Sequence, residues 1–357
     1  MPSCVPNWLN GMRRRTINRM ETSVVVADGL HNAFTDLIAW RGSLWLVYVA
    51  SPSHFASPKS RLVLLRSSDA REWQELARLG GSGEDIRDPK LAVIHDRLTL
   101  FALLNRSFDP LPYKTVRADS GDGRDWSPLV EAGPEGWLFG KPKTADEKTW
   151  YVPAHHLQKS SVALLRSSDG LHWEMLSAFC LGEKADETAI EFLSGGSLLA
   201  ATRLEAGGGL FGSPRAGSML SVSTPPYTNW TEGTHSAVTR LDGPALFPAL
   251  GSCYAVGRFQ PRLADPFGRQ GSIFSRKRTS LFKADASGLT WLANLPSAGD
   301  TAYAGIASWN GGWAISYYTS DPRRDGSWIL GMLRPTRIQI TRISSSELSN
   351  ITPQEGK

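Results

Sequence analysis

The stretch that decides the fold is Ser67-Ser68-Asp69-Ala70-Arg71-Glu72-Trp73, because its pattern S-x-D-x-x-x-W returns further along the chain. Two further copies are S-G-D-G-R-D-W at 120–126 and S-S-D-G-L-H-W at 167–173. A degenerate copy, D-A-S-G-L-T-W, occupies 285–291, and Ser223 to Trp230 fill the slot before it. The copies are spaced at roughly fifty residues or twice that, which is the length of one repeated supersecondary unit.

Each copy has the chemistry of a tight hairpin turn. The Asp carboxylate can accept hydrogen bonds from backbone N–H groups about two residues further on, and Gly supplies a φ that the turn needs. The Trp can fill the gap between neighbouring sheets. Apolar strands precede the copies, as in R-L-V-L-L-R at 61–66. We therefore assign Asp69, Asp122 and Asp169 to folding rather than to catalysis.

A second periodicity marks the opposite end of each unit, where an apolar strand begins. Six such starts follow one another: F-T-D-L-I at 34–38, R-D-P-K-L at 87–91, K-P-K-T at 141–144, D-E-T-A-I at 186–190, D-G-P-A-L at 242–246 and G-D-T-A-Y at 299–303. Strands of this kind converge on the axis of a propeller. The two periodicities together predict an all-β fold, a six-bladed β-propeller of four-stranded antiparallel blades.

The repeats also set the expected domain limits. We expect residues 1–21 to be an N-terminal extension, 22–340 to be a single six-bladed propeller, and 341–357 to be a C-terminal tail. The composition suits short strands joined by tight turns, with 34 Gly, 22 Pro and 13 Trp in 357 residues.

Charge and motifs exclude several classes of function. The net charge is only +5, and 39 basic residues are interspersed with 34 acidic ones, so we expect no nucleic-acid partner. Arg13, Arg14 and Arg15 are not followed by an apolar stretch, so no signal peptide is predicted, and no segment is apolar enough to cross a membrane. The default expectation is a cytoplasmic protein. The histidines and the triple glycine at 207–209 match no metal or phosphate motif, so no metal or cofactor is predicted.

Carboxylates recur at the strand starts, namely Asp36, Asp88, Glu187 and Asp300. A charge on a buried inner strand costs several kcal/mol unless it is paired or hydrated, so these groups are expected to face a water-filled axial mouth. The alternative is that each one is a turn or cap residue at the entrance of its strand.

The second strand of each unit returns to the same face and ends in polar residues. These ends are Asn105-Arg106, His155-His156, Arg203, Arg258 and Tyr317-Tyr318. Guanidinium groups that converge from different blades would bind a carboxylate bidentately, which suits an anionic sugar. The alternative for the arginines is solvent exposure or pairing with a neighbour such as Glu205.

The S-x-D-x-x-x-W turns resemble the Asp box of the sialidase superfamily, which is structural there. The resemblance extends to sialidase-like propellers often labelled exo-α-sialidase. It rests on H-N-A-F-T-D-L at 31–37, D-I-R-D-P-K at 85–90, D-E-T at 186–188, P-P-Y-T-N-W at 225–230, G-P at 243–244 and P-S-A-G-D-T-A-Y-A-G at 296–305. These pieces are collinear from about residue 31 to about 320 and imply Asp-box hairpins on the blades.

Sialidases combine an arginine triad for the substrate carboxylate, an Asp acid/base, and a Tyr nucleophile that a Glu activates. The resemblance implies Asp36 or Asp88 as acid/base, Glu187 as the partner carboxylate, and Tyr303 or Tyr317 as the phenol. The expected catalytic set is Asp36, Asp88, Glu187 and Tyr303. The expected substrate-binding set is Arg87, Lys90, Arg203, Arg258, Asp300, Tyr317 and His155.

This chain departs from the family pattern at two places. Ala50-Ser51 stand where the first blade's second strand ends in Arg-Glu in the family, and Ser320-Asp321-Pro322 replace Ser-His-Glu. The first change removes a guanidinium where a triad member would stand, and Arg87, Arg106 or Lys90 are the conceivable substitutes.

Three functional hypotheses follow. The first is an exo-acting glycosidase for an acidic or related sugar, with a glycan or small sugar as its partner. The second is a catalytically impaired propeller that binds a carbohydrate or a protein. The third, which the sequence supports least, is a polysaccharide lyase that uses His155 or His156 with a Tyr as base and acid.

Overall fold

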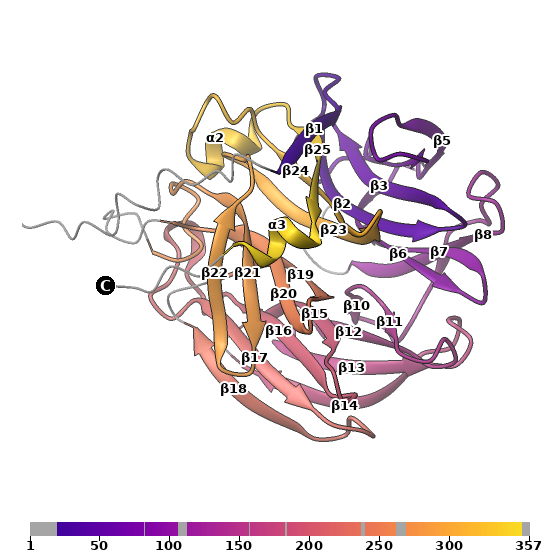
Figure 1. Ribbon diagram of the computed structural model, residues 1–357, viewed down its shortest axis with the longest axis vertical. Coiled ribbons are helices and arrows are strands. Elements are labelled where there is room, and N and C mark those ends of the chain that lie inside the picture. Colours follow the sequence, from indigo (N-terminus) through magenta and orange to yellow (C-terminus); the bar gives the residue numbers. More distant parts are fainter. Residues whose placement is uncertain are drawn as a thin grey trace, which may run out of the picture.

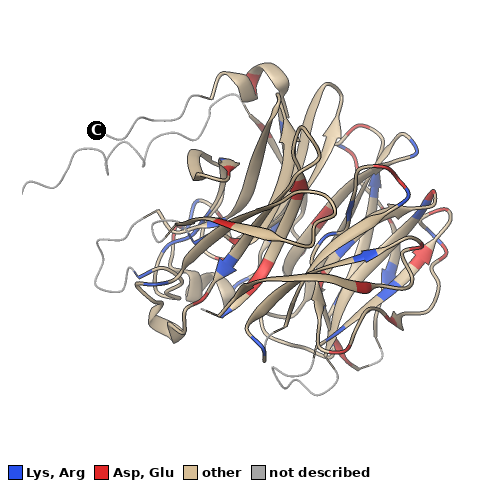
Figure 2. Cartoon of the chain, turned by 90° about the horizontal axis from the view of Figure 1, so that it is seen from below, with Lys and Arg blue, Asp and Glu red and all other residues tan. Residues whose placement is uncertain are grey.

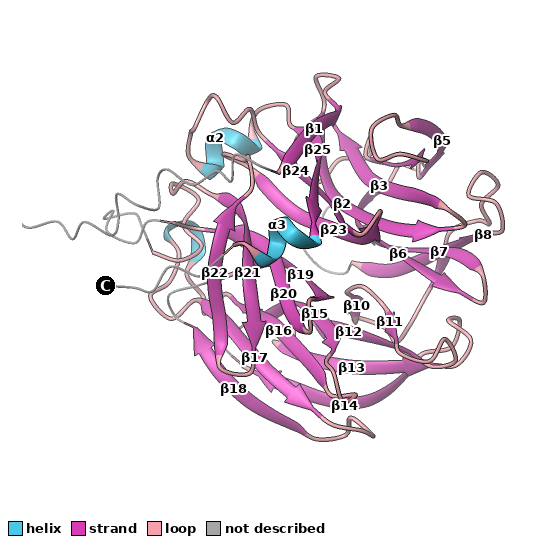
Figure 3. Ribbon diagram, in the orientation of Figure 1, coloured by secondary structure: helices cyan, strands magenta, loops and turns pink. Residues whose placement is uncertain are grey.

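The computed structural model describes residues 20–81, 83–105, 113–156, 158–182, 184–236, 240–261 and 269–351. Six antiparallel sheets are arranged around a central axis, and nearly all regular structure is strand (Figures 1 and 3). The predicted six-bladed β-propeller of four-stranded blades is therefore confirmed.

The first three blades follow one another along the chain. The first consists of β2 (His31–Trp40), β3 (Ser43–Ser51), β4 (Arg61–Ser67) and β5 (Gln74–Leu79). The second consists of β6 (Asp85–Ile94), β7 (Arg97–Asn105), β8 (Lys114–Ser120) and β9 (Val130–Glu131). The third has a divided inner strand and consists of β10 (Leu138–Phe139), β11 (Lys143–Thr144), β12 (Trp150–His156), β13 (Ser161–Ser167) and β14 (Glu174–Leu181).

The remaining blades complete the ring. The fourth consists of β15 (Ala185–Phe192), β16 (Leu198–Leu204), β17 (Gly217–Ser223) and β18 (Trp230–Ser236). The fifth consists of β19 (Asp242–Ala249), β20 (Ser252–Phe259), β21 (Arg278–Asp285) and β22 (Gly288–Asn294). The sixth consists of β23 (Thr301–Trp309), β24 (Gly312–Thr319), β25 (Arg337–Ser344) and β1 (Glu21–Val26).

The sixth blade closes the ring because its outer strand comes from the N-terminal part of the chain. Strand β1 pairs antiparallel with β25, so that Thr22 lies opposite Thr341. Strand β25 continues to Ser344. It therefore extends beyond residue 340, which the sequence repeats predict as the end of the propeller. A short helix, α3 (Ser345–Ser349), follows it and begins with a capping box between Ser344 and Glu347.

The other helical segments lie in connections between strands. They are η1 (Gly209–Phe211), a 3₁₀ turn, and α2 (Trp328–Met332), which follows β24. Within the described ranges, each helix is too short to cross a bilayer. Basic and acidic residues are spread over all parts of the molecule (Figure 2).

The S-x-D-x-x-x-W turns have the hydrogen bonds that their chemistry predicts. In the second copy, Oδ1 of Asp122 accepts the N–H groups of Arg124 and Asp125 at 2.8 and 2.9 Å. Asp69 and Asp169 accept the corresponding bonds in the first and third copies. These carboxylates therefore hold the hairpin between the third and fourth strands of a blade.

The turns also contact the preceding blade. A Cβ atom on Gly123 would lie 2.0 Å from the ring of Trp45, and one on Gly170 would lie 2.6 Å from Ile94. Both glycines have positive φ, 77° and 71°, so that glycine serves the turn and the close approach at once. The recurrent turn thus fixes the distance between neighbouring blades.

A further turn of this type escapes the sequence pattern because Thr replaces its first Ser. In T-A-D-E-K-T-W at 144–150, Oδ1 of Asp146 accepts the N–H groups of Lys148 and Thr149 at 3.0 and 2.8 Å. It joins β11 to β12 at the inner hairpin of the third blade rather than at an outer hairpin.

The inner strands carry β-bulges that re-aim side chains toward the axis. In β2, β6, β15, β19 and β23, two residues lie opposite one residue of the second strand. Four of the bulged residues have positive φ: Phe34 (54°), Asp88 (49°), Gly243 (55°) and Tyr303 (49°). Left-handed backbone is unfavourable for Phe, Asp and Tyr, and such strain concentrates at functional sites.

Candidate active site

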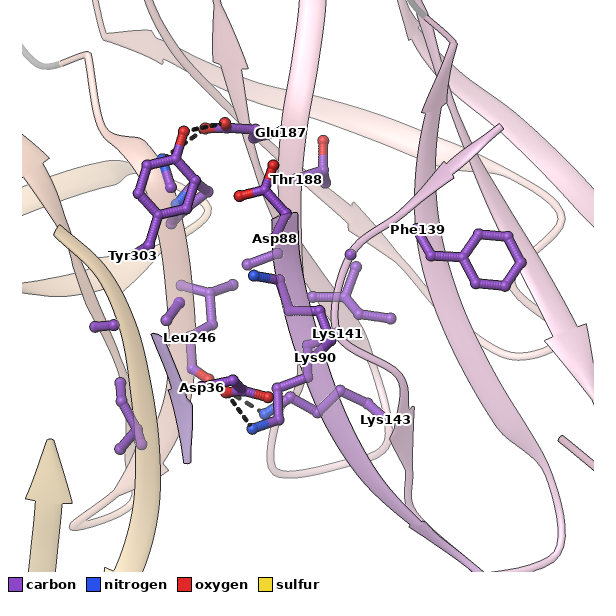
Figure 4. Close-up of a pocket in the computed structure, with 18 of the residues that line it drawn as sticks. Asp36, Asp88, Lys90, Phe139, Lys141, Lys143, Glu187, Thr188, Leu246 and Tyr303 are labelled. Atoms are coloured by element: carbon purple, nitrogen blue, oxygen red, sulfur yellow. Dashed lines mark hydrogen bonds and ion pairs between the residues drawn. The ribbon is translucent and has the colours of Figure 1, made fainter. Parts of the chain in front are cut away.

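A cavity of about 100 Å³ lies on the axis, where the inner strands converge. It adjoins a wider funnel of about 270 Å³. Residues that line both are Asp88, Leu103, His155, Glu187 and Tyr303. Figure 4 shows that Tyr303 and Glu187 meet at one end of the cavity, with Asp88 beside them and Asp36 at the other end.

Tyr303 and Glu187 form a hydrogen-bonded pair across the axis. The Tyr303 hydroxyl, on β23, donates to Oε1 of Glu187, on β15. Oε2 of Glu187 accepts from the backbone N–H of Gly243 at 2.7 Å and from Nη1 of Arg203 at 2.8 Å. Burial, with the Glu187 charge second, raises the pKa of Tyr303 well above its usual range. The phenol is therefore neutral and can lose its proton only to a neighbour such as Glu187.

Asp88 is a site carboxylate with little compensation for its charge. It is placed by the bulge of β6, and its buried Oδ1 has no hydrogen-bond partner in the described part of the chain. Burial raises the pKa of Asp88 to about 6, although the Lys90 ammonium opposes the shift. A carboxyl group with this pKa can donate a proton near neutral pH and take one back.

Arg203 and Arg258 are both buried and ion-paired. Arg203 binds Asp186 and Glu187, and Nε of Arg258 lies 3.0 Å from Oδ2 of Asp242. Burial by itself would lower the pKa of each guanidinium, but the neighbouring carboxylates raise it above its usual range. Both arginines are therefore fixed cations in the lining of the funnel, and Arg203 orients the carboxylate of Glu187.

Arg87, Lys90 and His155 also lie at the site. Arg87 lines the funnel, and its Nε lies 2.6 Å from Oδ2 of Asp85. Lys90 lines the cavity, with its ammonium 6.0 Å from the centre of the Tyr303 ring. Nε2 of His155 lies 3.0 Å from Oδ1 of Asp186. Arg106 lies outside the described residues.

Three of the predicted site residues lie in surroundings that differ from those of the Tyr303–Glu187 pair. Asp36 lines the cavity, but its carboxylate is bound by Nζ of Lys141 at 2.8 Å and by the N–H of Leu91 at 2.7 Å. Asp300 is fully buried and lines neither the cavity nor the funnel. Tyr317 is buried in the sixth blade, where its hydroxyl lies 3.2 Å from the carbonyl of Pro296. The structure thus brings Asp88 and Glu187 together with Tyr303, and leaves Tyr317 outside.

Several residues of the funnel were not predicted from the sequence. Among them are Phe34, His54, Asp186, Arg240 and Trp328. Asp186 had a signal, since it stands at an inner-strand start beside Glu187. No sequence pattern indicated Trp328, because it belongs to α2 and reaches the funnel only in the folded chain. The centre of its ring lies 4.1 Å from the guanidinium carbon of Arg258.

The first blade has no guanidinium at the end of its second strand. Ala50 and Ser51 are buried, and the side chains of Phe34 and His54 line the funnel on this side. Of the described arginines, Arg87, Arg203, Arg240 and Arg258 line the funnel. Each of these four has a carboxylate partner.

The arrangement of the blades defines the class by fold: the chain is a six-bladed β-propeller with the fold of the sialidases. A protein of unknown function from Dyadobacter fermentans superimposes with a TM-score of 0.64 at 17% identity, over 90% of this chain and 98% of that one. The phage phi92 endosialidase gives 0.67 at 10% identity, over 95% and 71%. Trypanosoma rangeli sialidase gives 0.65 at 13% identity, over 90% and 56%. At these identities the likeness is one of fold. No family model and no curated protein matches the sequence.

Proposed function

We propose that the chain is an exo-acting glycosidase for an acidic or related sugar, with its reaction centre at the axial cavity. The observation that carries this proposal is the hydrogen bond between the Tyr303 hydroxyl and Glu187, beside the protonatable Asp88. A phenol that shares its proton with a carboxylate can act as a nucleophile, and a carboxyl group with a raised pKa can act as the acid.

The reaction then proceeds in two displacements. Glu187 takes the phenolic proton while the Tyr303 oxygen bonds to the anomeric carbon, and Asp88 gives its proton to the departing glycosidic oxygen. In the second step, Asp88 takes a proton from water, and the water oxygen bonds to the anomeric carbon. The bond to Tyr303 breaks and Glu187 returns the proton to the phenolate. Two displacements retain the configuration at the anomeric carbon.

The charge of the site and the position of its lining residues support the choice of substrate. Lys90 reaches the cavity, and Arg87 and Arg258 line the funnel, so a substrate carboxylate would meet positive charge. The cavity and the funnel share Asp88, Glu187 and Tyr303 in their linings, so a sugar in the funnel would reach these groups. Trypanosoma rangeli sialidase, which is similar in fold, is known in complex with sialic acid.

The second candidate is a propeller that binds a glycan without turnover. The absence of a guanidinium at Ala50 and Ser51 favours it, because the remaining funnel arginines already have carboxylate partners. A substrate carboxylate would have to compete with these internal partners for the same donors.

The test is a panel of fluorogenic glycosides that includes a sialoside, a uronoside and neutral sugars. We expect turnover of at least one acidic glycoside by the wild type and its loss in Glu187→Gln. Binding of these sugars in calorimetry with no turnover by any of them would contradict the enzyme proposal and support the binding propeller. An unsaturated uronate absorbance would instead indicate a lyase.

A further inference from the structure

Two histidines and an aspartate converge where the first and sixth blades meet. His31 begins β2, His54 follows β3, and Asp300 precedes β23. Nε2 of His31 lies 3.1 Å from Oδ2 of Asp300, and Nδ1 of His54 lies 2.6 Å from the same oxygen. His31 and Asp300 are almost completely buried, whereas His54 is 18% exposed.

The hydrogen bonds around this cluster fix which atoms face its centre. Nδ1 of His31 lies 3.0 Å from the carbonyl oxygen of Arg334, so in the neutral ring Nδ1 carries the hydrogen and Nε2 carries a lone pair. Nε2 has no hydrogen-bond partner among the described residues. Oδ1 of Asp300 accepts from the Tyr318 hydroxyl at 2.9 Å and from Nε1 of Trp328 at 2.8 Å, which leaves Oδ2 for the centre.

A buried lone pair that faces a carboxylate oxygen lacks a positive partner. Two acceptors 3.1 Å apart are unfavourable unless a cation lies between them. We propose that His31, His54 and Asp300 form a binding site for a divalent transition-metal ion such as Zn²⁺. Such ions bind imidazole nitrogen and carboxylate oxygen. A histidine that binds a metal ion through one ring nitrogen usually donates the N–H of its other ring nitrogen to an acceptor such as a backbone carbonyl, which fixes the orientation of the ring.

The site needs only a small adjustment to take the ion. Ligands of a tetrahedral ion with bonds of about 2 Å lie roughly 3.3 Å apart, so the separation of His31 from Asp300 already fits. His54 has to move outward by less than ~1 Å. It lies in the connection between β3 and β4 and is partly exposed, so it has room to move.

The position of the site suggests its role. His54 lines the funnel, so three protein ligands would leave the fourth position of the ion for water on the funnel side. The ion would also join the connection after β3, in the first blade, to the start of β23, in the sixth. It would therefore strengthen the ring closure and hold one wall of the funnel in place. This inference does not depend on the proposed glycosidase activity.

The experiment uses the untagged protein after treatment with a chelator. Zn²⁺ is titrated by calorimetry, Co²⁺ by its visible absorption, and the melting temperature is measured with and without Zn²⁺. We expect one ion per chain, tetrahedral-type Co²⁺ absorption, and a melting temperature that rises by several degrees with saturating Zn²⁺. His54→Ala should weaken binding at least tenfold and remove the rise.

The matched control is His172→Ala, since His172 forms a similar pair with Asp169 but has no second histidine. It should bind Zn²⁺ as the wild type does, and so should Glu187→Gln, which tests the glycosidase separately. Equal binding by His54→Ala and the wild type, or no stoichiometric uptake by the wild type, would overturn the inference. His54→Gln provides a second variant if His54→Ala does not fold.

Discussion

The hydroxyl of Tyr303 donates its hydrogen bond to the carboxylate of Glu187, although 116 residues separate the two along the chain. They come from the sixth and the fourth blade and meet only at the axis. The Glu187 carboxylate is held by Arg203 and by the N–H of Gly243, so it is oriented before any substrate binds.

Removal of either member of this pair should abolish turnover while binding persists. Tyr303→Phe deletes the nucleophilic oxygen, and Glu187→Gln deletes the group that takes its proton. We expect kcat to fall by about 10² to 10⁴-fold in each variant, with sugar binding changed less than about tenfold. Steady-state kinetics and calorimetry on the same preparations measure the two effects.

Tyr317→Phe is the control for Tyr303→Phe, because Tyr317 is a buried tyrosine of the same blade that does not line the cavity. It loses hydrogen bonds to Pro296 and Thr341, so the free energy of unfolding should fall by about 1 kcal/mol. Its kcat should stay within about twofold of the wild type. Equal losses of kcat in the two variants would mean that a structural disturbance, not chemistry, explains the first.

Asp88→Asn should lower the activity of the protein and raise its stability. The burial that raises the pKa of Asp88 to about 6 makes its charged form costly at pH 7, and Asn removes that charge. We expect the free energy of unfolding at pH 7 to rise by about 1 to 3 kcal/mol while kcat falls. Denaturant unfolding measures the first quantity. A variant that is less stable than the wild type at pH 7 would contradict the buried-charge interpretation.

The pH dependence of stability follows from the same shift. Asp88 is protonated in both folded and unfolded protein well below pH 4, whereas between about pH 4 and 6 only the folded protein keeps the proton. Its contribution therefore makes the wild type less stable as pH rises through this window. The difference in unfolding free energy between Asp88→Asn and the wild type should be near zero at pH 3.5 and reach its full value above pH 6. A difference that does not vary with pH would exclude Asp88 as its source.

The pH dependence of kcat/KM should show a decline in the same pH range if Asp88 is the general acid. Above about pH 6, kcat/KM should fall by about tenfold per pH unit, because the protonated form becomes scarce. A dinitrophenyl leaving group departs with little help from an acid. For a substrate that carries it, the decline of kcat/KM with pH should be much weaker. The two substrates are compared in the same buffers, and declines of equal steepness would assign the titration to another group.

Because of the contact between blades, substitution of one turn glycine should destabilise the protein much more than substitution of another. Gly123 and Gly311 have nearly the same φ, 77° and 74°, but a Cβ atom would meet Trp45 at the first and nothing within 4 Å at the second. Gly311→Ala should cost about 1 kcal/mol of unfolding free energy through backbone strain alone. Gly123→Ala should cost at least about 2 kcal/mol more, because Trp45 must move. Similar losses in both would show that the turn, not the blade contact, sets the requirement.

Local sequence was sufficient for the architecture because a turn depends on residues that are close in the chain. The spacing of Asp122, Gly123 and Trp126 already specifies the hydrogen bonds that hold the hairpin, and its recurrence implies the blades. The phase of the inner strands likewise placed Asp88, Glu187 and Tyr303 at the axis. The turn at Asp146 was missed because a single Thr in place of Ser hid the pattern.

Only the tertiary structure decided how the polar residues share the site. The sequence treated Asp36 and Asp88 alike, but Lys141 from the third blade neutralises Asp36, while Asp88 is left without a comparable partner. In the same way, the fold separates Tyr317 from Tyr303, and it brings Asp300 together with His31 and His54. Repeats fix which strand ends face the axis, whereas the partners that each charge meets come from other blades and depend on the closed ring.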